Sequence, residues 1–335
     1  MQAAIYSMAG PALTADERAF FRDVDPAGYI LFARNCENRA QLKALTDELR
    51  SLHGHGDFPI MIDQEGGRVT RMKPPEWPML PAGEAFDRLY RLAPSSAMEA
   101  ARMNARTIAL LLRECGVNVN CLPMLDVRQP GATDIVGDRA YGGEPMQVAA
   151  LGRAVLEGMA SAGVLGVVKH MPGHGRALVD SHLELPVVDA SDDELAIDLE
   201  PFERLSSAPM GMVAHILFTA WDAERPSSQS PVVIDQVIRQ RIGFDGFLMT
   251  DDIGMQALAG SAGERSAAAI AAGCDATLHC SGKFDEMLDV ARHVGPLTPE
   301  ADARLARAMA GAMLDDDGPS LAEAAAKRDE LLALA

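Results

Sequence analysis

Residues 165–175 read LGVVKHMPGHG, a short apolar run that ends in a lysine and a histidine. The run Leu165–Val168 has the length and composition of a buried strand in a parallel sheet. Four more predicted strands also end in unusual polar residues: Asp63 follows Phe58–Ile62, Asp126 follows Val117–Met124, His215 follows Gly211–Ala214, and Asp251 and Asp252 follow Phe247–Met249. Five strands with such ends predict one shared pocket.

The same alternation of strand and helix runs through the whole chain. Predicted strands at Ala3–Met8, Tyr29–Phe32 and Ala276–His279 bring the total to eight, and helical spacing lies between most of them, as at Gln41–Leu52, Met98–Cys115 and Met146–Ala162. This pattern predicts an α/β fold, a single (β/α)₈ TIM-type barrel over residues 1–335, with the active site at the C-terminal rim of the strands. An open doubly wound sheet is the alternative. The tail, Leu321–Ala335, is predicted to be a closing helix.

Composition narrows the possible functions. The 335 residues are 48% hydrophobic and 23% charged, enough for a large core. The net charge of −18 disfavours nucleic acid and anionic membrane surfaces as partners. Neither a signal peptide nor a run of transmembrane length is predicted, and the five cysteines include no CxxC pair. These features fit a protein of the reducing cytoplasm. We also expect a monomer that acts on a small molecule.

Two polar segments are candidates for substrate binding. The first, DQEGGRVTR, runs from Asp63 to Arg71 after the third predicted strand. A carboxylate there can accept hydrogen bonds from adjacent sugar hydroxyls, and the paired glycines allow a tight turn or a close ligand. The second is the loop GDRAYG, in which Arg139 could contact a substrate oxygen. Each segment also fits an ordinary surface ion pair.

The segment KHMPGHGRALVDSH, residues 169–182, holds three histidines and a carboxylate. Asp180 lies two residues before His182, so its carboxylate can orient the imidazole and raise its basicity. A metal site formed by His170, His174 and His182 is the alternative. We expect no metal, because zinc barrels usually carry a His-x-His after an early strand and this chain has none after its first predicted strand.

Two adjacent aspartates end the seventh predicted strand. Asp252 fits the N-cap of a following helix. Asp251 would then point into the mouth of the barrel, where it is a candidate nucleophile or metal ligand.

Together these segments resemble glycoside hydrolase family 3, and most of all its compact branch of β-N-acetylglucosaminidases that act in peptidoglycan recycling. The matching stretches are IDQEGGRVTR (62–71), GDRAYGG (137–143), KHMPGHGRALVDSH (169–182) and MTDDIGM (249–255), and they occur in the family's order. The departures are mild: Met171 replaces a common Phe, Thr250 a common Ser, and Ile253-Gly254 a common Leu-Ser. They leave the shape of the leaving-group side open.

The resemblance implies a role for each matched residue. Asp251 corresponds to the nucleophile, His182 to the acid/base and Asp180 to its partner, while the substrate-binding set is Asp63, Arg71, Arg139, Lys169 and His170. It implies a retaining exo-β-N-acetylglucosaminidase without cofactor or metal. Its substrates would be N-acetylglucosaminyl-anhydromuropeptides, and its cellular context cell-wall biogenesis, cell shape and cell division.

Retaining hydrolysis needs a nucleophile and a second group that serves as acid and then as base. Larger relatives take a Glu acid/base from a second domain, which this chain has no length for, so His182 is the candidate. An imidazole with an unperturbed pKa of about 6.5 suits both tasks. We expect Lys169 or Arg139 to keep Asp251 ionised. The alternatives are a β-glucosidase, a phosphorylase, a metal-dependent hydrolase and a catalytically silent sugar-binding barrel.

Overall fold

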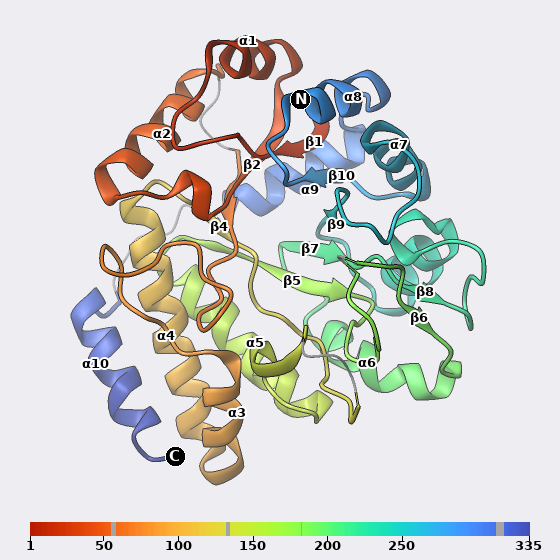
Figure 1. The fold of residues 1–335 in the computed structure, drawn as a ribbon. Helices are drawn as coiled ribbons and strands as arrows, with labels where there is room; N and C mark the ends of the chain where they lie inside the picture. The colour runs from red at the N-terminus through yellow and green to blue at the C-terminus, as the bar shows by residue number, and fades with distance from the viewer. Residues whose placement is uncertain (55–57, 132–134, 182, 313–317) are drawn as a thin grey trace.

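The computed structural model describes residues 1–335 except 55–57, 132–134, 182 and 313–317. Eight parallel strands form a closed barrel in the order β1-β10-β9-β7-β5-β4-β3-β2, and helices surround it (Figure 1). β1 pairs with both β2 and β10, so the sheet closes on itself. The predicted TIM-type barrel is confirmed, and the open doubly wound sheet is excluded.

The elements follow one another largely as strand and helix. The barrel strands are β1 (Gln2–Tyr6), β2 (Pro26–Leu31), β3 (Ile60–Ile62), β4 (Val119–Asn120), β5 (Leu165–Met171), β7 (Met210–Val213), β9 (Phe247–Asp252) and β10 (Ala276–His279). The helices are α1 (Ala15–Val24), α2 (Arg39–Ser51), α3 (Gly83–Leu92), α4 (Pro94–Glu114), α5 (Pro145–Ala160), α6 (Asp192–Arg204), the π-helical η4 (Val233–Arg241), α7 (Ala262–Ala272), α8 (Phe284–His293), α9 (Pro299–Ala310) and α10 (Leu321–Leu332). A small parallel pair, β6 (Val187–Val188) and β8 (Leu217–Phe218), lies outside the barrel.

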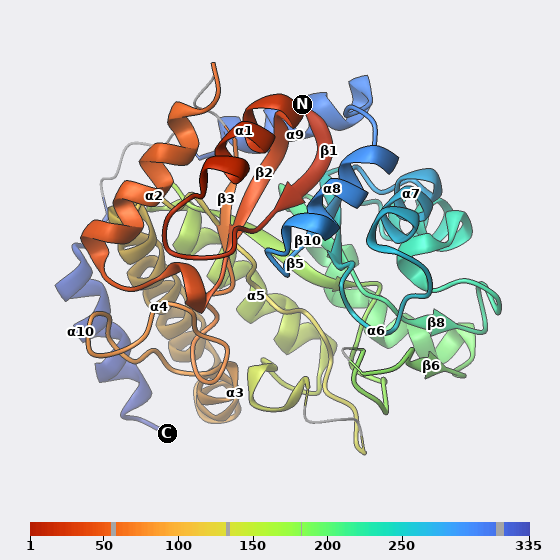
Figure 2. The same cartoon turned by 45° about the horizontal axis from the view of Figure 1, so that its top comes forward.

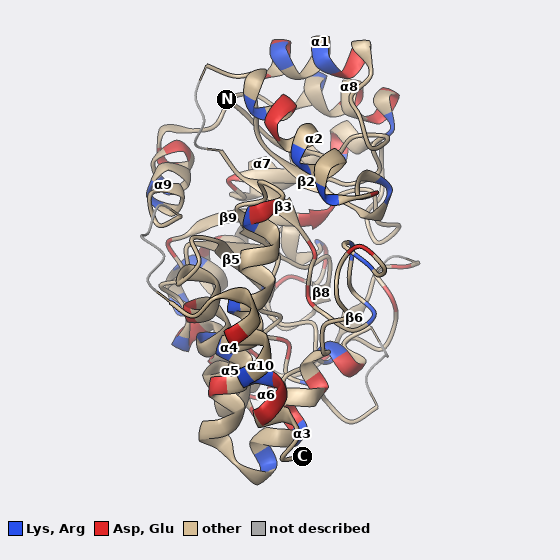
Figure 3. Cartoon of the chain, turned by 90° about the vertical axis from the view of Figure 1, so that its left-hand side faces the viewer, with Lys and Arg blue, Asp and Glu red and all other residues tan. Residues whose placement is uncertain are grey.

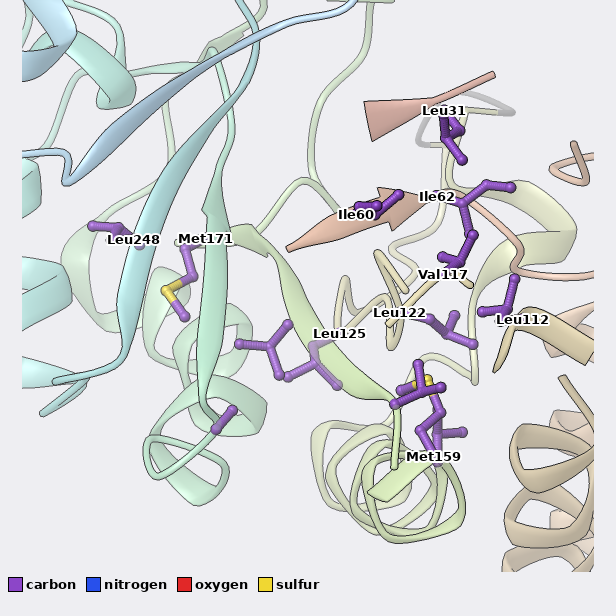
Figure 4. Close-up of a cluster of buried hydrophobic side chains, with 14 of the residues drawn as sticks. Leu31, Ile60, Ile62, Leu112, Val117, Leu122, Leu125, Met159, Met171 and Leu248 are labelled. Atoms are coloured by element: carbon purple, nitrogen blue, oxygen red, sulfur yellow. The ribbon is translucent and has the colours of Figure 1, made fainter. Parts of the chain in front are cut away.

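Alternation along the strands builds two apolar layers. In β3, Met61 belongs to the cluster inside the barrel, whereas its neighbours Ile60 and Ile62 belong to the larger cluster between strands and helices. Figure 4 shows part of this outer layer, where strand residues such as Ile62 lie near Leu112 and Val117. Both layers are required because the strands of a parallel barrel are buried on both faces.

The floor of the barrel is covered by α9. Its residues Leu305, Ala308 and Met309 join the inner cluster, and Arg304 Nη1 donates to Asp275 Oδ1 over 3.0 Å just before β10. The tail is helical, as expected, but α10 packs on α4 and α3 on the outside of the barrel (Figure 2). The closing role expected of the tail therefore belongs to α9, which leaves the opposite end of the barrel free for a pocket.

Several strands differ in length from the sequence-based expectation, and three of them, β4, β5 and β9, differ at the site. β4 is confined to Val119–Asn120, and beyond it the chain pairs with β5 again at an isolated bridge between Met124 and Lys169. β5 runs on to Met171, so Lys169 and His170 lie within the strand, just before its last residue, and do not follow it. β9 likewise runs on to Asp252, so Asp251 and Asp252 also lie within their strand and do not follow it.

The outer helices carry charges of both signs. In Figure 3, blue and red residues are interspersed on α1 and α9, and α9 contains Glu300 and Asp302 beside Arg304 and Arg307. Of the helices in the described part of the chain, none has both the length and the apolar character needed to span a bilayer.

Candidate active site

A pocket of about 300 Å³ opens at the C-terminal ends of the barrel strands. It brings together residues from seven separate segments of the chain. Seven predicted site residues line it: Asp63, Arg71, Arg139, Lys169, His170, Asp180 and Asp251. The eighth, His182, lies outside the described residues. Three of the five strand ends with unusual polar residues therefore share one pocket: those of Asp63, of Lys169 and His170, and of Asp251 and Asp252. Asp126 and His215 end the other two strands and do not line it.

Irregular pairing lets two neighbouring residues of one strand face this pocket. Regular strands turn successive side chains to opposite faces, yet Lys169 and His170 both line the pocket. The register of β5 against β7 shifts between Val168 and Met171, which removes the alternation there. A similar shift between β9 and β10 accompanies Asp251 and Asp252, which also both line the pocket.

Five of the pocket residues form one network of charges on one wall. Lys169 Nζ lies 2.9 Å from Asp63 Oδ1 and 2.6 Å from Glu65 Oε1. Arg139 donates from Nε and Nη2 to the two oxygens of Glu65 over 2.8 and 2.7 Å, and Arg71 Nη2 lies 3.1 Å from Asp63 Oδ2. Buried charges of this kind require such pairing, since the side chain of Lys169 is only 2% exposed.

The network keeps its carboxylates ionised. Burial alone would raise the pKa values of Asp63 and Glu65, but Lys169, with Arg71 at Asp63 and Arg139 at Glu65, outweighs burial and lowers both. Burial likewise opposes the charge on Lys169, and the two carboxylates reverse this and raise its pKa. Asp63, 14% exposed, can therefore offer an ionised acceptor to hydroxyl groups in the pocket.

Asp251 lies opposite this network at the end of β9. Its side chain is 15% exposed, and its Oδ2 lies 4.0 Å from His170 Nε2. Burial would raise its pKa, but His170, His215, the amide of Asp252 and, to a smaller degree, Lys169 lower it. The expectation holds for Lys169, although the two histidines and the Asp252 amide lower the pKa of Asp251 more, while Arg139 is engaged by Glu65.

His215 contacts the backbone at the end of β9. Its Nε2 lies 3.0 Å from the carbonyl oxygen of Asp252, to which it can donate, and its Nδ1 lies 2.7 Å from Ser228 Oγ. Burial lowers the pKa of His215, which favours this neutral arrangement. Asp252 itself accepts from the amides of Gly254 and Cys280 over 2.9 and 3.1 Å. It does not cap the next helix, since Ser261 is the N-cap of α7.

A buried carboxylate that the sequence did not single out as a site residue, Asp126, lies behind His170. Its Oδ2 is 2.7 Å from His170 Nδ1, and its Oδ1 accepts from the backbone amides of His170 at 3.3 Å and His174 at 2.6 Å. Asp126 is completely buried. Burial would raise its pKa, but His170 and His174 lower it.

The loop that carries Asp180 begins from a fixed base. The amide of His174 is held by Asp126, and Arg176 Nε donates to Asp198 Oδ2 of α6 over 2.5 Å. Ala177 then packs in a small apolar cluster with residues of β6 and β8. Further along, Ser181 Oγ lies 3.4 Å from His174 Nε2. The base of the loop is therefore tied to the barrel, and Asp180 and Ser181 reach the pocket.

Two functional residues, Glu65 and Asp126, were noted in the sequence without a role. Glu65 belongs to the segment after β3, where only Asp63 and Arg71 were selected, yet it pairs with both Arg139 and Lys169. Asp126 follows β4 as the other site residues follow their strands. Their position just after a barrel strand was the signal that could have identified both residues, because the C-terminal ends of the strands share one rim.

The arrangement can bind a polyhydroxylated ring and attack it. Asp63 accepts hydrogen bonds on one side, and the ionised Asp251 presents a nucleophilic oxygen on the other. Among the described residues, no three His, Cys, Asp or Glu side chains are arranged to hold a metal ion. The metal alternative included His182, which lies outside them.

The sequence matches the family model described as the glycosyl hydrolase family 3 N-terminal domain over residues 4–309. The fold, the pocket and this match agree, and the chain belongs to glycosyl hydrolase family 3. It is a glycoside hydrolase of the β-hexosaminidase group, as the following relatives indicate.

A β-hexosaminidase of Bordetella avium is 36% identical over 90% of this chain and 86% of its own length. A β-hexosaminidase of Methylococcus capsulatus is 37% identical over 91% of this chain and 86% of its own length. The crystal structure of native NagZ from Neisseria gonorrhoeae superposes with a TM-score of 0.89 at 32% identity, covering 99% of this chain and 98% of NagZ. NagZ in complex with N-trifluoroacetyl-D-glucosamine gives a TM-score of 0.86 at 30% identity over 99% and 98% of the two chains.

Proposed function

We propose that this single-domain chain is a retaining exo-β-N-acetylglucosaminidase with Asp251 as nucleophile, His182 as acid/base and Asp180 as the partner of His182. Asp63, Arg71, Arg139, Lys169 and His170 form the substrate-binding set. The observation that carries the proposal is the pair of ionised carboxylates in one pocket: Asp251 flanked by histidines, and Asp63 held by Lys169 and Arg71. A catalytically silent sugar-binding barrel would need only the second carboxylate, Asp63.

The chemistry follows from these positions. In the first step Asp251 attacks the anomeric carbon, the glycosidic bond breaks, and His182 gives its proton to the departing oxygen. In the second step His182 takes a proton from water, which displaces Asp251 from the sugar. Two inversions return the β-anomer. Asp251 must be ionised at the start, and its lowered pKa provides this at neutral pH.

The substrate class is an amino sugar at the end of a chain. NagZ of Neisseria gonorrhoeae binds an N-acylated glucosamine, and this chain resembles it over nearly its whole length. We assign to this chain N-acetylglucosaminyl-anhydromuropeptides as natural substrates, a monomeric state, and a role in peptidoglycan recycling in the cytoplasm. The pocket supports an exo-acting enzyme, because about 300 Å³ holds little more than one sugar ring.

The decisive test compares hydrolysis of a nitrophenyl β-N-acetylglucosaminide with that of the matching β-glucoside, each with and without EDTA. We expect turnover of the first substrate, little of the second, and no effect of EDTA or added zinc. Preference for the glucoside would reassign the substrate. Loss of activity in EDTA that zinc restores would favour a metal-dependent hydrolase, and a rate that requires phosphate would favour a phosphorylase.

A further inference from the structure

Asp126 has the contacts of a group that fixes its neighbours, although it does not line the pocket. It is completely buried behind His170, and three N–H groups of two residues converge on its two oxygens. His170 Nε2, on the other side of the ring, faces Asp251 at 4.0 Å. The ring thus lies between Asp126, which does not itself line the pocket, and the proposed nucleophile Asp251.

The chemistry of the carboxylate determines where the proton of the ring lies. An ionised carboxylate accepts hydrogen bonds and donates none, so the 2.7 Å contact requires a proton on Nδ1 of His170. The nitrogen that faces the pocket, Nε2, is then the one whose lone pair is free in the neutral ring. A hydrogen bond to one ring nitrogen sets the state of the other in this way in many active sites.

We propose that Asp126 is a positioning residue that fixes the tautomer and orientation of His170 toward the sugar and Asp251, and that holds the base of the Asp180 loop through the amide of His174. This inference rests on the proposed function for its effect on catalysis, but its structural part does not. The two tasks use different oxygens: Oδ2 binds the ring, and Oδ1 binds the two amides.

Because the two oxygens of Asp126 have different tasks, the variant Asp126→Asn can test them separately. The amides of His170 and His174 need an acceptor, so the carboxamide oxygen must take the place of Oδ1. The NH₂ group then takes the place of Oδ2 and points at His170 Nδ1. Because an NH₂ group donates, Nδ1 must become the acceptor, and the proton moves to Nε2. The loop base is retained, whereas Asp126→Ala removes both tasks.

The tautomer can be measured by ¹⁵N NMR of histidine-labelled full-length protein, with His170 assigned through His170→Asn. Spectra are recorded at a pH where titration shows the ring to be neutral. We expect the proton on Nδ1 in the unmodified protein and on Nε2 in Asp126→Asn. Asp275→Asn is the matched control: Asp275 is a buried carboxylate at the barrel floor, bound to Arg239 and Arg304, and its replacement should leave His170 unchanged.

Kinetics separate the two tasks of Asp126. Asp126→Asn should lower kcat/KM by about 10- to 100-fold, the range expected when a hydrogen bond to a charged group is lost. The factor should be equal for nitrophenyl and disaccharide substrates, because His170 does not protonate the leaving group. Asp126→Ala should lower the rate further with the disaccharide, because the loop base is then also released.

A proton on Nε2 in the unmodified protein would overturn the inference, and this measurement requires no variant to fold. Unchanged tautomer and kcat/KM in folded Asp126→Asn would overturn it as well. If the unmodified protein cleaves no β-N-acetylglucosaminide, the proposed function fails, and the tautomer measurement still decides the role of Asp126.

Discussion

Lys169 illustrates how single residues in this pocket combine burial with charge. Its side chain is 2% exposed, so its charge would be unstable alone, but the ammonium group bridges Asp63 and Glu65. Because Arg139 shares Glu65 and Arg71 shares Asp63, each carboxylate has two cationic partners. The network therefore holds Asp63 in a defined place while it remains ionised for hydrogen bonds from a sugar.

His182→Ala should harm poor leaving groups most. A sugar alkoxide is a strong base and must be protonated as it leaves, whereas a nitrophenolate leaves unaided. General acid–base catalysis contributes about 10²- to 10⁴-fold, so kcat/KM for a disaccharide should fall by about that factor, and much less for the nitrophenyl glycoside. Asp180→Ala should show the same pattern more weakly. Equal losses with both substrates in steady-state assays would remove His182 from the acid role.

The sequence predicted which residues line the pocket better than what they do there. Strand ends and motif resemblance identified Asp63, Lys169 and Asp251 because position on a barrel strand determines location. Roles depend on partners, and partners are set by distances that no motif contains. Arg139 was expected to support Asp251, but it forms a two-pronged ion pair with Glu65. Asp126 was passed over because its contacts with His170 and His174 exist only in the folded chain.

The element that matters most is β5 with the loop after it. Within β5 the register of the pairing with β7 shifts before Met171, and both Lys169 and His170 line the pocket. Such an irregularity depends on packing against β4 and β7, so strand propensity could not predict it. The loop then passes close to the segment after β4, where a Cβ built on Gly175 would lie 1.9 Å from the carbonyl oxygen of Val127.

Gly175→Ala should therefore impair catalysis more than folding. The added methyl group forces apart the loop base and the Val127 backbone, next to Asp126. A displacement of about 1 Å at catalytic groups can cost about 10²-fold in rate, and we expect a fall in kcat of that order with little change in far-UV circular dichroism. Gly295→Ala is the matched control, because a Cβ there meets nothing within 4 Å. Equal activity of both variants would show that the loop tolerates the displacement.

At the scale of the whole molecule, the barrel separates stability from function. Its floor is closed by α9, and its apolar layers lie inside and outside the strands, while the charged network occupies the opposite end. Acidic residues exceed basic ones by 18, yet both signs mix on the outer helices (Figure 3). The site holds a buried network of ionised groups, so it should also affect how stability depends on pH.

Glu65→Gln should destabilise the protein most above the ordinary carboxyl pKa. The folded-state pKa of Glu65 is depressed below its usual 4.5, so its contribution is present above that value and is lost as the pH falls toward the folded pKa. Breaking a buried pair costs about 3–5 kcal/mol, and this difference from the unmodified protein should shrink by about 1.4 kcal/mol per pH unit below 4.5. Urea unfolding of both proteins at pH 7, 4 and 3 measures this difference in the free energy of unfolding. A difference that does not change with pH would contradict the assigned ionisation.

The central claim is that Asp251 forms a covalent bond with the sugar. In His182→Ala, a nitrophenyl β-N-acetylglucosaminide should still glycosylate Asp251, but no base remains to activate water, so the glycosyl-enzyme should accumulate. Mass spectrometry of the intact protein and its peptic peptides measures this directly. The account predicts one N-acetylglucosaminyl group on the peptide that contains Asp251, at Asp251 itself. An unmodified Asp251 peptide, together with release of the α-anomer by the unsubstituted enzyme, would contradict it.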